Sequence, residues 1–247
     1  MPRPESRMEI NGMQLNCQSI NNKLGDLKLL IGHLKPDFVA FSETWITCNS
    51  PSFYNYHAEW KHRHDRPGGG LGFLIRRGLQ YENFELSPFI NGCLEVQAMK
   101  IHLRSRQTIV ILGIYNPNRN LSYAEMEFYI DQLGDKFVIL GDFNAHSPIL
   151  SDNCARTNTT GRTVEEMISS SRAALITPYN FFTRIDLANL STSCLDLCFA
   201  SANIATVCSV ELLRGVGSDH LPVKIKIELE PKFSEISWNV GKRRAEI

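Results

Sequence analysis

One stretch near the middle of the chain constrains the fold most, because it joins a buried strand to a pair of polar side chains. Residues 137–140 are four consecutive apolar residues, which is typical of a strand buried on both faces. Gly141 follows, and then Asp142 and Asn144, two positions apart. Side chains two apart on an extended chain share a face, so an acid and an amide are expected to point together from a strand end. A simple turn is the other interpretation, since Gly, Asp and Asn are turn residues.

The rest of the chain alternates strand-like and helix-like patterns. Residues 24–34 carry apolar side chains at helical spacing, with an asparagine at 21 or 22 as the expected cap and a proline at 36 as the stop. This helix lies between the expected strands Met8 to Asn16 and Asp37 to Phe41, so the chain begins with a strand, a helix and a strand. Further strands are expected at 71–75, 93–102, 108–115, 194–199, 205–213 and 223–229, and further helices at 121–133 and 163–174.

Many strands with few helices, several of them consecutive hairpins, favour a mixed-sheet α/β sandwich in one domain. We expect this domain to span residues 8–230, with polar tails at 1–7 and 231–247. A length of 247 residues and an apolar fraction of 43% suit a folded protein with a sizeable core. No apolar run approaches the length of a membrane span and no secretory segment is evident, so we expect no membrane partner. As an isolated domain, the chain is expected to be monomeric.

Charge and cysteine content narrow the function further. Lys and Arg number 26, as do Asp and Glu, and this balance counts against a protein whose only role is to coat nucleic acid. The seven cysteines are odd in number and lack a Cys-x-x-Cys motif, which predicts free thiols in an intracellular reducing compartment. Cys194 and Cys198 are four apart but lie in an expected strand, so we do not expect them to bind a metal.

Two other segments invite a binding-site interpretation that their spacing does not support. Residues 48–66 contain several histidines and arginines but match no zinc pattern, and we expect a solvated basic loop. The glycines at 68–70 lack the Lys-Ser/Thr ending of a phosphate loop and open no helix, so a hairpin turn is expected.

A set of polar residues falls at the ends of the expected strands. Its members are Asn16, Glu43, Tyr115, Asp142, Asn144, Asp196, Asp219 and His220. If they meet, four carboxylates lie together, which is unfavourable unless a cation compensates their charge. Oxygen ligands without a thiolate select Mg²⁺ or Mn²⁺, and such an ion also binds phosphate oxygens. The set therefore suits the hydrolysis of a phosphate ester.

Two motifs within this set resemble the endonuclease/exonuclease/phosphatase superfamily, which includes apurinic-site endonucleases, DNase I-like nucleases and inositol-polyphosphate phosphatases. They are Leu140-Gly141-Asp142-Phe143-Asn144 and Ser218-Asp219-His220-Leu221-Pro222, with Asn16 and Glu43 at early strand ends. The segments 15–23, 36–45, 141–148 and 192–197 are similar to the endonuclease domain of non-LTR (LINE-type) retrotransposon proteins. The order and spacing of these motifs, which extend from 16 to 220, make the resemblance specific.

The resemblance implies a DNase I-like, four-layer α/β sandwich, with two mixed β-sheets flanked by helices. It also implies catalytic roles for five residues. Asp142 orients or deprotonates the attacking water, and Asn144 positions the phosphate or the nucleophile. Tyr115 contacts the phosphate. His220 donates a hydrogen bond to the scissile phosphate, and Asp196 orients His220.

The metal site and the rim are implied in the same way. Glu43 binds the ion with Asn16 beside it, Asp219 supports the metal region, and Ser218 fills a small polar position. His146 recurs in the retrotransposon branch, and we expect it to be structural. The arginines at 76, 77, 104 and 106 are expected to be solvated strand ends rather than DNA contacts.

The implied function is a Mg²⁺-dependent (or Mn²⁺-dependent) endonuclease domain that nicks double-stranded DNA in the nucleus. The nick leaves a 3′ hydroxyl for target-primed reverse transcription, and a reverse transcriptase domain is expected in a full-length parent protein. Alternatives are a DNA-repair nuclease or phosphatase of the same fold, and a non-catalytic module that binds DNA or a partner. The sequence shows no basic pocket for several phosphates, which counts against an inositol-lipid phosphatase.

Overall fold

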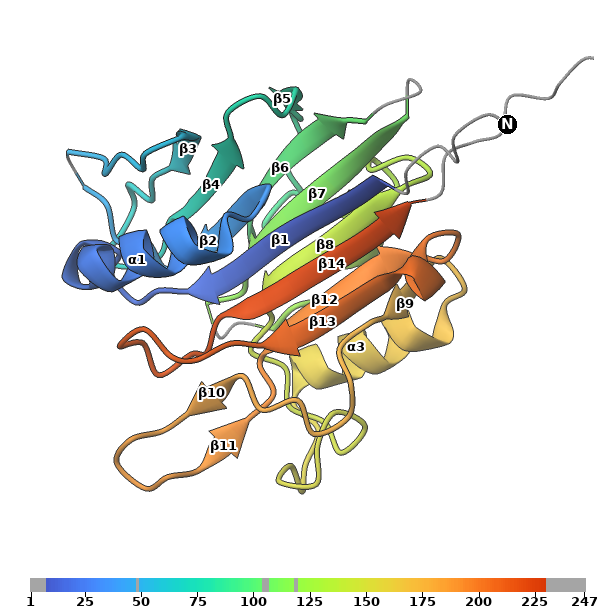
Figure 1. Cartoon of the computed structure of the whole chain (residues 1–247). Coiled ribbons are helices and arrows are strands. Elements are labelled where there is room, and N and C mark those ends of the chain that lie inside the picture. The colour runs from blue at the N-terminus through green and yellow to red at the C-terminus, as the bar shows by residue number, and fades with distance from the viewer. Residues whose placement is uncertain (1–7, 48, 104–106, 118–119, 230–247) are drawn as a thin grey trace, which may run out of the picture.

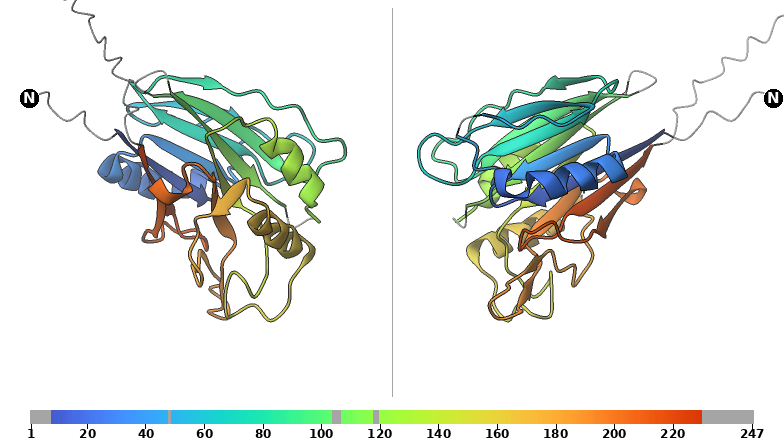
Figure 2. Two further views of the ribbon diagram at one scale, coloured as in Figure 1. Left: turned by 90° about the vertical axis from the view of Figure 1, so that its right-hand side faces the viewer. Right: turned by 60° about the vertical axis from the view of Figure 1, so that its left-hand side comes forward.

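Two six-stranded β-sheets pack face to face, and helices cover their outer faces (Figures 1 and 2). The structure is a computed structural model that describes residues 8–47, 49–103, 107–117 and 120–229. The layers confirm the predicted four-layer α/β sandwich of the DNase I-like type. The expected tails 1–7 and 231–247, together with Cys48, Arg104 and Arg106, lie outside the described residues.

The first sheet has the strand order β13-β14-β1-β2-β4-β3. Only β1 and β2 are parallel, and α1 connects them, so the predicted strand–helix–strand beginning is confirmed. The bounds are Cys208–Leu212 for β13, Val223–Leu229 for β14, Met8–Asn16 for β1, Phe38–Ser42 for β2, Leu71–Arg76 for β4, Tyr56–Lys61 for β3 and Leu24–Leu34 for α1.

The second sheet has the order β5-β6-β7-β8-β12-β9, in which only β7 and β8 are parallel. A separate two-stranded hairpin, β10-β11, extends beside the sandwich (Figure 1). The bounds are Tyr81–Asn83 for β5, Glu95–His102 for β6, Thr108–Tyr115 for β7, Phe137–Asp142 for β8, Asp196–Ser201 for β12, Ala173–Leu175 for β9, Arg184–Ile185 for β10 and Thr192–Ser193 for β11. The remaining helices are α2 (Tyr123–Ile130) and α3 (Thr159–Ser169), with short 3₁₀ turns at Asn21–Lys23 and Ala205–Val207.

Three apolar clusters hold the four layers together. The inner faces of both sheets form the central cluster, which includes Phe38, Phe73 and Ile225. Leu27 and Ile31 of α1 pack on the outer face of the first sheet, and α2 and α3 pack on the outer face of the second. Burial of both faces explains why the central strands read as continuous apolar runs rather than as an alternating pattern.

Several predicted boundaries differ from the structure for identifiable reasons. The helix expected at 163–174 begins at Thr159, because the Asn158 side chain accepts a hydrogen bond from Gly161 N (2.6 Å) and caps it. The asparagines at 21 and 22 do not cap α1; they form a 3₁₀ turn before it. Residues 48–66 are not irregular throughout, since 56–61 form the edge strand β3 and pair with β4 in the predicted hairpin. The short strands β5, β9, β10 and β11 were not predicted.

Strand direction brings the polar strand ends to one end of the sandwich. In the first sheet, Asn16 pairs with Ser42, which precedes Glu43. In the second sheet, Asp142 pairs with both Tyr115 and Asp196. Among the described residues, no helix is long and apolar enough to cross a membrane.

Candidate active site

Asn16 joins the two sheets at the centre of the polar cluster. Its side chain is fully buried, and Nδ2 donates to Glu43 Oε1 and to Asp142 Oδ2, each at 2.8 Å. The backbone oxygen of Asn16 accepts from Ser218 Oγ at 2.8 Å. The Asn16 amide therefore bridges carboxylates that belong to different sheets.

Glu43 lies just after β2 with a positive φ of 51°, and its carboxylate is held on both oxygens. Trp45 Nε1 donates to Oε2 at 3.2 Å, while Asn16 holds Oε1. The Tyr115 phenol lies beside this carboxylate. Burial, and then the negative charge of Glu43, raise the pKa of Tyr115, so the phenol stays protonated.

Arg63 supports this side of the site, which corrects the expectation of a wholly solvated basic loop. Its guanidinium carbon lies 5.6 Å from the centre of the Tyr115 ring, and it forms an ion pair with Glu95. Only 9% of the Arg63 side chain is exposed. Glu95 also accepts from Gly70 N at 2.7 Å, which ties the glycine turn before β4 to the site.

Asp142 ends β8 and is positioned by the glycine before it. Gly141 has a φ of 143°, and a Cβ there would lie 2.0 Å from the Ile114 oxygen, so only glycine fits. Asp142 Oδ1 accepts from Asn144 N at 2.9 Å, and Asn144 has a φ of 50°. Asp142 and Asn144 therefore meet through a turn rather than through strand alternation, and the turn is part of the site.

Burial, and then the neighbouring negative charge of Asp196, raise the pKa of Asp142 to about 7. The Asn144 side chain is fixed beside Asp142, because its Nδ2 donates to the backbone oxygen of Asn116 at 2.7 Å. Asp142 thus combines a pKa near neutrality with a fixed orientation, which suits a general base.

His220 and Asp196 form a buried acid–imidazole pair, as predicted. His220 Nδ1 lies 2.7 Å from Asp196 Oδ2, and both residues are almost fully buried. Burial lowers the pKa of His220, but the charge and hydrogen bond of Asp196, together with the charges of Asp142 and Asp219, outweigh burial and raise it to about 9. Burial likewise acts to raise the pKa of Asp196, but the charge of His220 and the hydrogen bonds from His220, Gln14 and Thr183 together outweigh it and lower that pKa. The pair is therefore an imidazolium and a carboxylate at neutral pH.

Two buried residues that the sequence analysis missed hold Asp196 in place. Gln14 Nε2 donates to Asp196 Oδ1 at 2.8 Å, and Asp196 N donates to Thr183 Oγ1 at 3.0 Å. Gln14 precedes Asn16 by two positions on β1, so the same-face rule that linked Asp142 to Asn144 was a usable signal for it. Nothing local marked Thr183.

Asp219 lies at the rim of the cluster. Its Oδ2 accepts from Arg184 Nε at 2.8 Å, and its Oδ1 lies 3.9 Å from His220 Nε2. Oδ1 is a buried oxygen with no hydrogen-bond partner in the described structure. Arg184 is a further residue that the sequence analysis missed.

The structure leaves other candidates outside the cluster. His146 is exposed, and its backbone N donates to Asn158 Oδ1 at 3.1 Å. Arg76 lies at the end of β4 that is remote from Glu43 and forms an ion pair with Asp37, which agrees with a solvated strand end.

The residues present fit a hard divalent cation, although no metal cage is preformed. The donors are carboxylate and amide oxygens of Glu43, Asn16 and Asp219, and the unpartnered Asp219 Oδ1 is an available ligand atom. Within the described ranges, no group of three or more His, Cys, Asp or Glu residues has the arrangement of a metal site. Oxygen donors of this kind suit Mg²⁺, which takes one or two carboxylates and completes its shell with water and phosphate.

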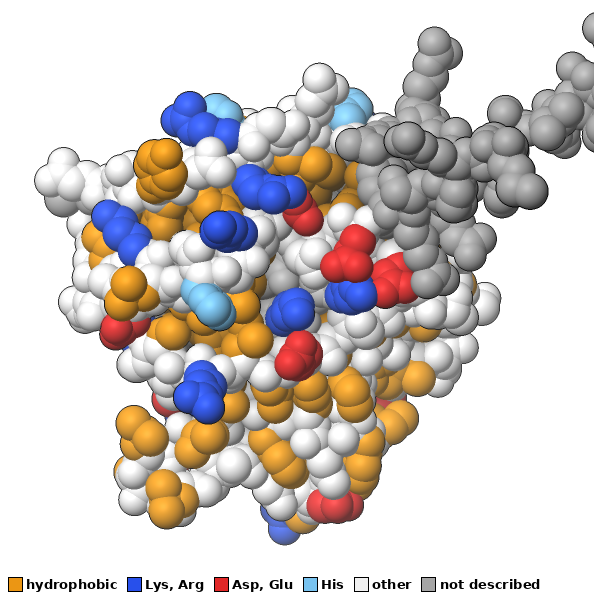
Figure 3. Space-filling view, viewed as in Figure 1, with side chains coloured by type: hydrophobic (Ala, Val, Ile, Leu, Met, Phe, Trp, Pro, Cys, Tyr) orange, Lys and Arg blue, Asp and Glu red, His pale blue; other side chains and the backbone are white. Residues whose placement is uncertain are grey.

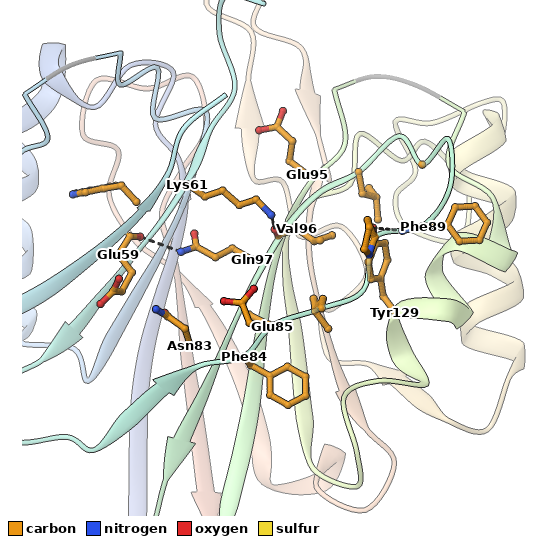
Figure 4. Close-up of a pocket in the computed structure, with 16 residues that line it drawn as sticks. Glu59, Lys61, Asn83, Phe84, Glu85, Phe89, Glu95, Val96, Gln97 and Tyr129 are labelled. Atoms are coloured by element: carbon orange, nitrogen blue, oxygen red, sulfur yellow. Dashed lines mark hydrogen bonds between the residues drawn. The ribbon is translucent and has the colours of Figure 1, made fainter. Parts of the chain in front are cut away.

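A groove of about 450 Å³ lies beside this site rather than in it (Figure 4). It separates the edge strand β3 from β6 and the loop that follows β5, and Lys61 Nζ crosses it to Val96 O (2.9 Å). Glu59, Glu85 and Glu95 line it, so its walls are mainly acidic and apolar. Glu95 is the link between the groove and the Arg63–Tyr115 contact. On the face that Figure 3 shows, basic and acidic side chains are interspersed.

Comparison with known proteins agrees with this geometry. A family model described as "Endonuclease-reverse transcriptase" matches residues 109–224. The endonuclease domain of TRAS1, a telomere-specific non-LTR retrotransposon, superposes with a TM-score of 0.72 over 90% of this chain and 100% of that chain, at 13% identity. In this segment and in its fold, the chain is similar to the endonuclease/exonuclease/phosphatase superfamily.

Other solved nucleases have the same fold at similarly low sequence identity. The AP endonuclease LMAP from Leishmania major has a TM-score of 0.71 at 15% identity, over 92% of this chain and 93% of that chain. The 3′-5′ exonuclease NExo from Neisseria meningitidis has a TM-score of 0.67 at 16% identity, over 89% and 100%. No curated protein matches the sequence. Together these comparisons support a nuclease of this fold.

Proposed function

We propose that the chain is a metal-dependent endonuclease domain that nicks double-stranded DNA in the manner of a non-LTR retrotransposon. The observation that carries this is the Asn16 bridge, which brings Glu43 of one sheet and Asp142 of the other within hydrogen-bond reach of one amide. The likeness to the TRAS1 endonuclease domain and the matching family model support the retrotransposon branch.

The side chains divide the chemistry of phosphodiester hydrolysis among them. Asp142, with a pKa of about 7, accepts a proton from the attacking water. His220, held as an imidazolium by Asp196, donates to a phosphate oxygen on which charge builds in the transition state. Tyr115, whose raised pKa keeps its proton, stands beside Glu43 as a second donor.

A divalent cation held by Glu43, with Asn16 beside it and Asp219 near, would compensate the carboxylates and polarise the phosphate. Asn16 fixes the Glu43 carboxylate for this purpose through Oε1, and Trp45 fixes it through Oε2. The chain's own contribution is therefore a preset orientation of Glu43.

The biological setting follows from the same proposal. A nick with a 3′ hydroxyl end would prime reverse transcription in the nucleus, by a reverse transcriptase domain of a longer parent protein. With a net charge of zero, the isolated domain would act as a monomer that depends on local phosphate contacts rather than on a general basic field.

Nicking of supercoiled plasmid tests the proposal. We expect nicking with Mg²⁺ or Mn²⁺, none in EDTA, and losses of at least about 100-fold in Glu43→Gln and His220→Ala. Glu59→Gln, a partly buried acid at the adjoining groove, is the matched control and should retain activity. Extension of the nicks by a DNA polymerase would show the 3′ hydroxyl end.

Parallel substrates distinguish the alternatives. Preference for a duplex with an abasic site would favour a repair nuclease, and release of phosphate from inositol phosphates would favour a phosphatase. Folded protein that binds duplex DNA but cuts nothing with any divalent ion would refute the nuclease and favour a binding module.

A further inference from the structure

Arg184 is fixed by its backbone against the segment that carries His220. Arg184 and His220 form an isolated antiparallel bridge. Ile185 N donates to the backbone oxygen of Asp219 at 2.8 Å, and Leu221 N donates to the backbone oxygen of Thr183 at 2.7 Å. The start of β10 is therefore held in register with the catalytic histidine, and the Arg184 side chain has a defined starting point at the rim of the site.

The Arg184 guanidinium uses one of its five N–H donors. Nε donates to Asp219 Oδ2 at 2.8 Å, whereas the two terminal nitrogens make no hydrogen bond to the described residues. The side chain is 32% exposed and Asp219 is 15% exposed, so the terminal nitrogens are accessible from solvent beside a largely buried carboxylate. Arg76 is different, because it bonds to Asp37 through a terminal nitrogen, Nη2.

Arg184 and His220 face different oxygens of the Asp219 carboxylate. Asp219 Oδ2 bonds to Arg184, and Oδ1 lies 3.9 Å from His220 Nε2. Each cation therefore has its own oxygen of Asp219 as a neighbour. On this basis the Arg184 subsite is assigned to a phosphate next to the one that His220 contacts.

His146, which also lies near Arg184, is a further potential hydrogen-bond donor. Burial, and then the positive charge of Arg184, lower the pKa of His146, which places the guanidinium near the exposed imidazole. Asp219 is already paired with Arg184 through Nε. A guanidinium with free terminal nitrogens is a geometric match for two phosphate oxygens.

We propose that Arg184 forms a phosphate subsite next to the catalytic centre, which binds the nucleic-acid phosphate adjacent to the one that is cleaved. Nε holds Asp219 while the terminal nitrogens contact the phosphodiester anion. The subsite rests on the proposed function, because it takes a phosphodiester chain as its ligand. It gives the His220 segment and the β10-β11 hairpin a common contact with the substrate.

Binding of a fluorescent DNA duplex in EDTA, measured by anisotropy over a series of salt concentrations, tests the subsite without cleavage. Arg184→Gln retains an N–H donor for Asp219 and removes the charge. We expect weaker binding and a slope of log Kd against log salt that is smaller by about 0.9, the value for one phosphate contact on duplex DNA. Arg184→Lys should keep the slope. Arg76→Gln alters an Arg–Asp pair at the opposite end of β4 and should change neither the affinity for DNA nor the salt slope.

The outcomes separate this subsite from the proposed function. An unchanged slope in Arg184→Gln, even with slower nicking, would mean that Arg184 only positions Asp219 and would overturn the subsite. If the unaltered protein neither binds nor nicks DNA, the proposed function fails and the subsite with it. Should Arg184→Gln not fold, the arginine Nε–H signals of the unaltered protein give the answer. Addition of duplex should shift the Arg184 signal and leave that of Arg76 in place, and no shift of Arg184 would refute the contact.

Discussion

Replacement of Asp196 by Asn should change how the stability of the metal-free protein depends on pH. Asp196, with smaller contributions from Asp142 and Asp219, raises the pKa of His220 from its ordinary value of 6.5 to about 9 against the opposing effect of burial. That rise corresponds to roughly 3 kcal/mol in favour of the folded state. Because the folded pKa lies above the unfolded one, this contribution is complete below pH 6.5 and is lost as the pH rises through 9.

In Asp196→Asn, only the smaller contributions of Asp142 and Asp219 oppose the effect of burial on His220, so the pKa of His220 falls and most of the contribution to stability disappears. The free energy of unfolding should therefore differ between the two proteins by roughly 3 kcal/mol near pH 6 and by much less near pH 9.5. Asp142 acts in the same direction, because the negative charge of Asp196 helps to raise its pKa and the substitution removes that charge.

Urea unfolding in EDTA between pH 6 and 9.5 gives these free energies, and the NMR titration of the His220 imidazole gives its pKa directly. Asp131→Asn is the control, since Asp131 forms an exposed ion pair with Arg172 and should cost little at any pH. A difference between Asp196→Asn and the unaltered protein that stays constant from pH 6 to 9.5 would refute the assigned charge state of the pair.

Three further substitutions test separate features. Trp45→Phe removes the donor to Glu43 Oε2, and we expect the Mg²⁺ concentration for half-maximal nicking to rise roughly 10-fold with an unchanged melting temperature; an unchanged Mg²⁺ requirement would count against this. Gly141→Ala places a Cβ against the Ile114 oxygen, so we expect a loss of about 2 kcal/mol or more in urea unfolding together with loss of nicking. Phe199→Ala empties a fully buried position of the core between β8 and α3, and should cost about 3–5 kcal/mol; the exposed Leu29→Ala is its control.

Much of the secondary structure was predictable because it depends on local pattern. Strands β1 and β14 have the predicted bounds, and β8 contains the four consecutive apolar residues 137–140. The predicted helix at 24–34 also has its predicted bounds, although its cap differs. Short edge strands such as β5 and β9 carry too few residues to show a period, and their pairing with a longer neighbour decides their conformation.

The composition of the site was also readable, whereas its connections were not. Apolar runs that end in Asn16, Glu43 or Asp142 mark strand ends, and parallel strands bring such ends to one edge. The sequence does not reveal that the Asn16 amide donates hydrogen bonds to carboxylates from both sheets, because Asn16 and Asp142 are 126 residues apart.

The sequence by itself determined the alternation of strands and helices, the glycine at 141 and the residue types at the strand ends, because backbone conformation and burial act within a few residues. Only the tertiary structure decided that Gln14 holds Asp196 across 182 residues, that Arg63 lies over Tyr115, and that Arg184 pairs with Asp219. These contacts depend on how the two sheets and the β10-β11 hairpin pack together, and no short-range pattern carries that information.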